Sequence, residues 1–169
     1  SILDNGNLIR KVALPMEVFP VATVLFNLAQ YLFALVVFFP MAFFFLDVAP
    51  ALSWLNFLPI LVLQVLFTLG FCFLVSAATV FYRDIRHFTE ILLMLLFWLT
   101  PIIYDINAVP DSLRTAISLN PLSYFILSYQ DALYRNVFPA SDRLLAVISL
   151  TFLFIALGYR LVINLKSRF

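Results

Sequence analysis

Long uncharged stretches dominate the pattern of hydrophobic and polar positions along the chain. Residues 18–46 and 48–82 contain no Asp, Glu, Lys, Arg or His, and Asp47 alone separates them. A helix needs about 20 mainly apolar residues to cross a hydrocarbon core of ~30 Å, so each stretch is long enough to span a bilayer. The pattern predicts an integral membrane protein with an all-α, polytopic fold.

Four spans follow from this pattern. The third is the shortest in uncharged sequence, since residues 91–104 count only 14 positions. Its first turn must therefore hold Arg86, His87 and Glu90 at the interface. We expect Glu90 to pair locally, because the two basic side chains precede it by four and three residues. The expected spans are residues 19–46, 55–82, 85–104 and 144–165.

The placement of Lys and Arg orients these spans. Basic residues precede the first span, separate the second from the third, and end the fourth, whereas the link after the first span has none. The positive-inside rule then places both termini and the 83–87 loop in the cytoplasm and residues 105–142 outside. An even number of spans also requires both termini on one side. The orienting residues are Arg10, Lys11, Arg83, Arg86, Arg160, Lys166 and Arg168.

The segment between the third and fourth spans is too apolar for a solvated loop. Pro110 marks a helix start, and Asn120-Pro121 ends that helix and begins another, with Asn as N-cap and Pro at the first position. Residues 109–135 are predicted to form an external helical hairpin. This hairpin either lies flat on the outer surface or dips back into the bilayer.

Composition agrees with a membrane protein and excludes several chemistries. Hydrophobic residues make up 64% of the chain and charged residues 11%, with a mean hydropathy of +1.08, whereas soluble domains are about 25% charged. The three glycines do not form a phosphate-binding loop, so ATP hydrolysis cannot belong to this chain. A single cysteine, Cys72, and the absence of a Cys/His cluster leave no predicted metal site.

Four motifs occur in series. Residues 5–20 read Asn, Leu-Ile, a basic pair, then Pro-x-Glu and a second Pro, and residues 81–87 hold Arg-Asp-Ile. Residues 97–104 read Phe-Trp-Leu-Thr-Pro-Ile-Ile-Tyr, and residues 119–122 read Leu-Asn-Pro-Leu. In order and spacing the chain resembles the permease subunit of bacterial ABC-2 type exporters for polysaccharides and polyol-phosphate polymers, such as O-antigen, capsule or teichoic acid.

The resemblance implies a function and a set of partners. The chain would be the transmembrane subunit of an ATP-driven exporter that moves a lipid-linked polysaccharide or related cell-envelope polymer across the bacterial inner membrane. Its partners would be an ABC ATP-binding subunit, which holds ATP and Mg²⁺, a second copy of the permease, the polymer and membrane lipid, with no nucleic acid. Family members have about six spans, so we expect this chain to be a C-terminal fragment holding spans three to six.

Two charged segments are candidates for coupling to the ATP-binding subunit. The resemblance implies that residues 5–17 form a coupling helix, whereas the residues alone favour a basic anchor on anionic lipid. For the 83–87 turn, the alternative to coupling is a loop that sets the membrane topology, with Asp84 paired locally. The candidate coupling residues are Asn7, Leu8, Arg10, Lys11, Pro15, Glu17, Arg83, Asp84, Arg86 and His87.

Aromatic and hinge residues after position 96 are candidates for a conduit or gate. Trp and Tyr at a membrane boundary form an interfacial belt in many proteins. The alternative is a set of aromatic faces along which sugars slide. The candidate residues are Phe97, Trp98, Tyr104, Asn120, Pro121, Tyr124, Phe125 and Tyr129.

Three other functions compete with polymer export. One is an ABC-2 permease for a small drug or lipid. Another is part of a membrane-embedded transferase, which would need acidic or His residues at membrane depth; Glu90 alone approaches that description, and it is predicted at the cytoplasmic side. The third is a structural membrane scaffold.

Overall fold

The computed structural model describes residues 17–45, 52–82, 84–102, 104, 106 and 109–166, apart from the side chains of residues 111 and 166. Every regular element in these ranges is helical, which confirms the all-α class. The elements are α2 (Val18–Phe45), the 3₁₀ helix η1 (Leu52–Asn56), α3 (Phe57–Phe81), α4 (Ile85–Leu99), α5 (Asp111–Leu119), α6 (Pro121–Tyr129), the π-helical turn η3 (Gln130–Tyr134) and α7 (Ser141–Lys166).

Three helices are long and apolar enough to cross a membrane, which makes this a multi-pass membrane protein. They cover Val18–Phe45, Leu52–Phe81 and Ser141–Leu165. These correspond to the first, second and fourth predicted spans, with boundaries shifted by a few residues. Pro40 lies inside α2 without ending it.

The helix predicted over residues 85–104 is shorter than expected. α4 has 15 residues and ends at Leu99, which gives a rise of about 22 Å against the ~30 Å of a hydrocarbon core. The cause is Pro101, which disfavours a helical conformation at the preceding residue. Thr100 is accordingly extended, with φ −83° and ψ 130°. α4 therefore ends five residues before Tyr104, the end of the span that the sequence predicts.

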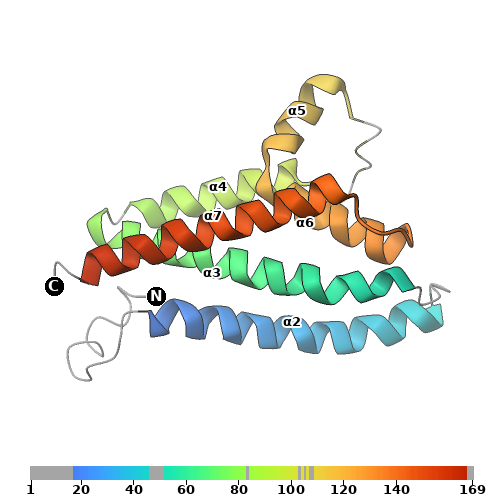
Figure 1. Ribbon diagram of the computed structural model, residues 1–169, viewed down its shortest axis with the longest axis horizontal. Coiled ribbons are helices and arrows are strands. Elements are labelled where there is room, and N and C mark those ends of the chain that lie inside the picture. The colour runs from blue at the N-terminus through green and yellow to red at the C-terminus, as the bar shows by residue number, and fades with distance from the viewer. Residues whose placement is uncertain are drawn as a thin grey trace.

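α3 lies at the centre of the bundle, with α2 on one side and α7 along another (Figure 1). α3 and α7 run parallel in a register that repeats every seven residues. Thr151 Oγ1 donates to the Leu63 carbonyl, and Gly158 lies against Gly70. A Cβ at Gly70 would lie 2.5 Å from the Ile155 nitrogen. Small residues let membrane helices approach this closely, so the pair fixes where the two helices cross.

The bundle has two distinct ends. The α4 end holds the start of α2, the end of α3, the start of α4 and the end of α7, and the η1 end holds η1, η3 and the start of α7 (Figure 1). The main core lies toward the η1 end, where α3, α6, η3 and α7 meet. Its fully buried members are Ile60, Phe67, Phe125, Ala132 and Val147.

Candidate functional site at the joint between α4 and α6

The buried side chain of Asn120 joins the end of α4 to the start of α6. Its Nδ2 donates to the Leu96 carbonyl and to Thr100 Oγ1, both at 2.9 Å, and its Oδ1 accepts from the Leu122 N–H at 2.9 Å. Asn120 is only 2% exposed. One amide therefore caps the N-terminus of α6, as predicted, and also meets a carbonyl that the end of α4 leaves open.

The other open carbonyls near this helix end also have partners. The Tyr104 hydroxyl donates to the Leu99 carbonyl at 2.9 Å, and Gln130 Nε2 donates to the Pro101 carbonyl at 2.7 Å. A buried carbonyl left without a partner costs about 1–3 kcal/mol. The joint is thus an irregular stretch of backbone. Carbonyls there that lack a helical backbone partner accept hydrogen bonds from Tyr104, Asn120 and Gln130, which come from three separate segments.

α4 and the α6–η3 unit continue one another through the bundle. α4 runs from the α4 end toward the middle, and α6 runs from there to the η1 end (Figure 1). The 9 residues of α6 and the 5 of η3 rise about 20 Å if counted at the α-helical 1.5 Å per residue. Neither piece alone matches the ~30 Å hydrocarbon core, whereas the two together exceed it.

The helical hairpin predicted over residues 109–135 has its two helices, but they are not packed side by side. α5 projects away from the bundle, whereas α6 lies against α3 and α7 (Figure 1). Ile117 is the buried apolar residue of α5, while Leu113 and Leu119 are exposed. The two helices meet at Asn120, and α6 is a core element rather than a helix on the protein surface.

The predicted aromatic residues divide into exposed and buried sets. Phe97 and Trp98 are exposed at the end of α4, with ring centroids 5.9 Å apart. Phe125 is 2% exposed and packs on Phe67 with centroids 5.2 Å apart. The Tyr129 hydroxyl donates to Gln64 Oε1 at 2.6 Å. The expected open face on α6 is thus turned inward, because its aromatic stripe packs on α3 and α7.

Tyr124, the remaining aromatic candidate on α6, is partly exposed. Its hydroxyl donates to the Ser118 carbonyl at 2.9 Å. This bond joins α6 back to the last turn of α5 and fixes the direction in which α5 leaves the joint.

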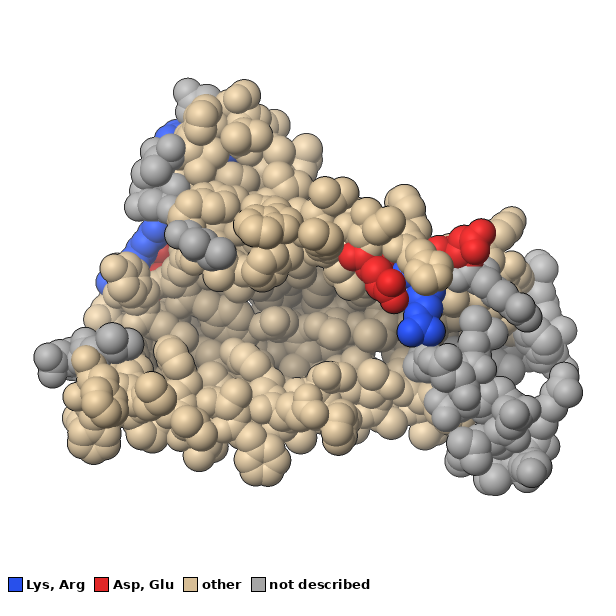
Figure 2. Space-filling model, turned by 180° about the vertical axis from the view of Figure 1, so that it is seen from behind, with Lys and Arg blue, Asp and Glu red and all other residues tan. Residues whose placement is uncertain are grey.

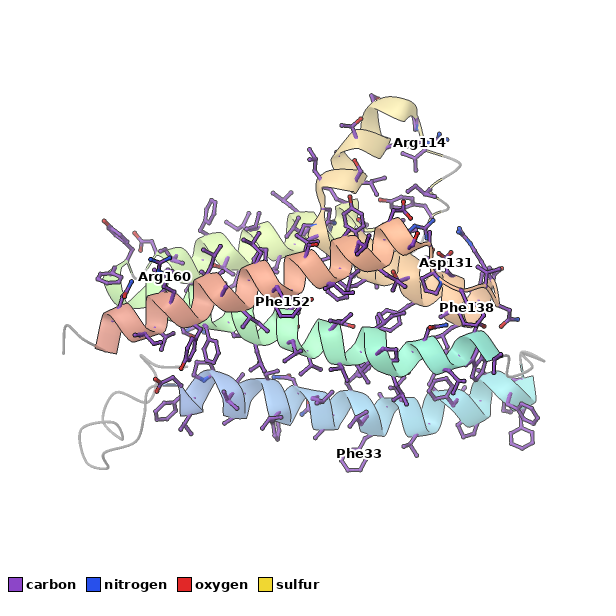
Figure 3. The ribbon with its side chains drawn as sticks, in the orientation of Figure 1. Phe33, Arg114, Asp131, Phe138, Phe152 and Arg160 are labelled. Carbon is purple, nitrogen blue, oxygen red and sulfur yellow. The ribbon has the colours of Figure 1, made fainter. Side chains whose placement is uncertain are left out.

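A buried carboxylate at the η1 end was missed by sequence reasoning. Asp131 is almost fully buried; Arg135 Nη1 lies 3.0 Å from its Oδ1, and Arg143 of α7 donates to its Oδ2. The i,i+4 spacing of Asp131 and Arg135 was the available signal. The bond to Arg143 joins η3 to the start of α7. Figure 3 shows Asp131 between these two elements.

Hydrogen bonds from η1 hold the same region from the other side. Ser53 Oγ donates to the Ala132 carbonyl at 2.9 Å, and Trp54 Nε1 donates to Asn136 Oδ1 at 3.3 Å. Asn136 adopts a left-handed φ of 55°, a conformation that Asn tolerates better than most residues. The π-helical turn is therefore fixed between η1 and α7.

The ABC-2 type transporter family matches residues 1–134, which is most of the chain. The chain belongs to the ABC-2 type transporter family. This confirms the family that the motif series resembles.

Curated relatives narrow the comparison. An O-antigen export system permease protein RfbA of Klebsiella pneumoniae is 30% identical over 171 aligned residues, which cover 100% of this chain and 65% of that protein. A second Klebsiella pneumoniae protein of the same name is 32% identical over 137 residues, 80% of this chain and 52% of the relative. A Myxococcus xanthus protein of that name is 28% identical over 149 residues, 87% of this chain and 57% of the relative. The chain thus spans about half to two thirds of their lengths.

In this member of the ABC-2 family, acidic and basic side chains gather at the α4 end (Figure 2). Arg86 Nε lies 3.4 Å from Glu90 Oε1 and His87 Nδ1 lies 3.6 Å from Glu90 Oε2, with all three side chains exposed. The predicted local pairing of Glu90 is confirmed. Asp84 is exposed beside them, and Glu17 precedes α2 at the same end.

The remaining coupling candidates lie outside the described residues. The prediction of a coupling helix over residues 5–17 therefore stays a prediction. The candidates concerned are Asn7, Leu8, Arg10, Lys11, Pro15 and Arg83.

Proposed function

We propose that the chain is part of the transmembrane permease of an ATP-driven exporter that moves a lipid-linked polysaccharide or related cell-envelope polymer across the bacterial inner membrane. Membership of the ABC-2 family and three relatives named as O-antigen export permeases support this function. The sequence has no phosphate-binding loop, so a separate ATP-binding subunit hydrolyses ATP.

The observation that carries the proposal is the capped break between α4 and α6. Non-helical backbone at membrane depth is tolerated where it is buried in protein or lines a water-filled cavity. α4 and the α6–η3 unit together form one discontinuous crossing, and the chain leaves the bundle between them as α5. A crossing that is interrupted and held by side-chain hydrogen bonds is suited to opening and closing, since it shifts by exchanging a few bonds rather than by unfolding a helix.

The joint is the proposed gate of the conduit. Asn120 and Pro121 form its hinge, and Phe97, Trp98, Tyr104 and Tyr124 lie around it on exposed or half-exposed surfaces. Aromatic rings there stack on the C–H faces of sugars without fixed hydrogen bonds. Phe125 and Tyr129 instead fasten α6 to α3, so they act on the gate through its position. A second copy of the permease would complete the passage.

The α4 end is the proposed cytoplasmic side. Its exposed Arg86 and Arg160 accord with the positive-inside rule. Residues 5–17 and the 83–87 turn, which both adjoin this end in the sequence, would then receive force from the ATP-binding subunit.

Deletion and complementation in the source bacterium tests the function. Removing the permease gene should abolish surface polymer and leave lipid-linked polymer inside the cell, and the wild-type gene should restore it, as followed by surface immunolabelling and by fractionated polymer gels. A matched control supplies the permease together with an ATP-binding partner whose nucleotide-binding Lys is replaced. Unchanged surface polymer in the deletion strain contradicts the proposal; loss of drug or lipid efflux in that strain instead favours the small-molecule permease.

A further inference from the structure

Two ladders of polar side chains face each other between α2 and α3. Each ladder repeats every four residues, which places its members on one face of its helix. They line a hollow of about 300 Å³ between the two helices. The ladders were not singled out by sequence reasoning, although their spacing is visible in otherwise apolar helices. They comprise Thr23, Asn27 and Tyr31 on α2 and Gln64, Thr68 and Cys72 on α3.

Part of the hydrogen-bonding capacity of these ladders is used within the protein. Asn27 Nδ2 donates to the Thr23 carbonyl at 2.8 Å, and Gln64 Oε1 accepts from Tyr129. Among the described residues, no partner is found for the Tyr31 hydroxyl, Asn27 Oδ1 or Gln64 Nε2. Two donors and an acceptor, on residues that line the hollow at different heights along the bundle, thus have no partner among the described residues.

The opposite wall of the same groove is apolar. A second hollow, of about 540 Å³, shares Thr68 and Cys72 with the first and extends across α3 to α4 and the start of α6. Its far wall includes Leu92, Leu96 and Leu122. Figure 2 shows this depression on the face between α2 and α4, without Lys, Arg, Asp or Glu on its visible floor.

Lipid tails are a poor occupant of such a groove. A polar group transferred into hydrocarbon without a hydrogen bond costs several kcal/mol, so the three open groups require a hydrogen-bonding occupant. A docked helix would present backbone groups that are already bonded and would need a polar side chain at each matching height. A sugar chain has hydroxyls on every unit for the ladders and C–H faces for the leucine wall.

We propose that this groove is a hydrated carbohydrate-contact surface, in which Asn27, Tyr31 and Gln64 exchange hydrogen bonds with sugar hydroxyls. The inference rests on the proposed export function and assigns it polar contacts on α2 and α3, across the groove from Leu96 and Leu122, which border the α4–α6 joint. Neutral amide and hydroxyl groups hold a passing sugar less tightly than charged groups do, which suits a chain that must move on.

Thiol accessibility tests whether the groove is wet. Native Cys72 is one probe, and Asn27→Cys and Thr68→Cys in a Cys72→Ser background are two others, each in the full permease with its ATP-binding subunit in membranes. The control is Phe33→Cys, because Phe33 is 74% exposed and points away from the bundle (Figure 3). A hydrophilic methanethiosulfonate should modify the groove positions at least about tenfold faster than position 33, since thiolates form in water and not in lipid. Equal rates would mean a dry groove, filled by lipid or another helix, and would overturn the proposal.

Two further readouts test for sugar rather than water alone. Modification of the Asn27→Cys variant should be slower in cells making polymer than in cells whose polymer synthesis is blocked. Tyr31→Phe, which removes one hydroxyl, should reduce the rate at which polymer reaches the surface, whereas Tyr159→Phe on exposed α7 should not. A wet groove with no polymer protection and normal export in Tyr31→Phe overturns the carbohydrate contact. Surface polymer in the wild type reports the export function independently, so the two failures are distinguishable.

Discussion

At the residue scale, the amide of Asn120 connects two helix ends that their own backbones leave open. Its Nδ2 donates to the Leu96 carbonyl and to Thr100 Oγ1, and its Oδ1 accepts from the Leu122 N–H. The amide of Asn has two N–H donors and a carbonyl acceptor in one short planar group, whereas an ionised Asp side chain can only accept, so Asn suits this position. Asp131 has a comparable role at the η1 end, where its two oxygens accept from arginines of η3 and α7.

Asn120→Ala should destabilise the permease by about 1–2 kcal/mol, because it removes the cap on the Leu122 N–H and one of the two side-chain bonds to the Leu96 carbonyl, which still accepts from Thr100 Oγ1. Thermal unfolding of the purified protein in detergent measures the change, and the amount of surface polymer measures its effect on the proposed gate. Ser118→Ala is the matched control, since its exposed hydroxyl bonds only its own helix. Equal melting temperatures for Asn120→Ala and wild type would show that the joint does not depend on this side chain.

At the scale of elements, the arrangement depends on how closely α3 and α7 approach. Gly70 and Gly158 lie in direct contact, and Ala77 continues the small-residue surface toward the α4 end. The absence of side chains at the crossing lets Thr151 reach the Leu63 carbonyl. The α3–α7 pair then forms the surface on which α6 packs, so the position of the joint depends on this crossing.

Gly158→Ala should force α3 and α7 apart, because the added Cβ meets the backbone carbonyl of Gly70, which cannot rotate away. Overpacking of this kind costs typically 1–3 kcal/mol. Ala156→Val, on the exposed side of the same helix, adds bulk without meeting α3 and serves as control. Unfolding in detergent should show that Gly158→Ala is less stable than Ala156→Val. Equal stability of the two variants would indicate that α3 and α7 repack around the added Cβ without a loss of free energy.

At the scale of the whole molecule, the chain is a bundle in which α3 is central and α2 is attached to one side. Most side chains of α2 are exposed within this chain, and several of them are polar. Curated relatives are longer than the matched region. The bundle places the charged α4 end and the Asp131 cluster at opposite ends, which gives the molecule two chemically distinct faces across the membrane.

The α4 end should be cytoplasmic and the η1 end external, because basic residues favour the cytoplasmic side. Asp84→Cys and Phe138→Cys, each in a Cys72→Ser background, place one exposed thiol at each end. An impermeant thiol reagent should label position 138 in cells with a permeabilised outer membrane and position 84 only after lysis. The reverse labelling pattern would invert the topology.

The sequence by itself determined the features whose causes are local. Long uncharged runs placed α2 and α3, and an apolar stretch interrupted only by Arg160 placed α7, since helix length and burial in lipid depend on neighbouring residues. Asn120-Pro121 marked a helix start because a cap bonds within two or three positions. The pairing of Glu90 with Arg86 and His87 followed from the same one-turn spacing. The motif series also indicated the family, although no single motif is specific.

Only the tertiary structure decided the features that join distant positions. Asn120 bonds a carbonyl 24 residues earlier, Tyr129 bonds a side chain 65 residues earlier, and Ser53 bonds a carbonyl 79 residues later. Hydropathy cannot identify such partners, because it records how apolar a face is and not which element covers it. The apolar stripe of α6 was therefore as compatible with an open gate surface as with a buried one, and the structure shows that Phe125 packs in the core. The same limit hid the groove between α2 and α4, whose two walls come together only after the bundle has formed.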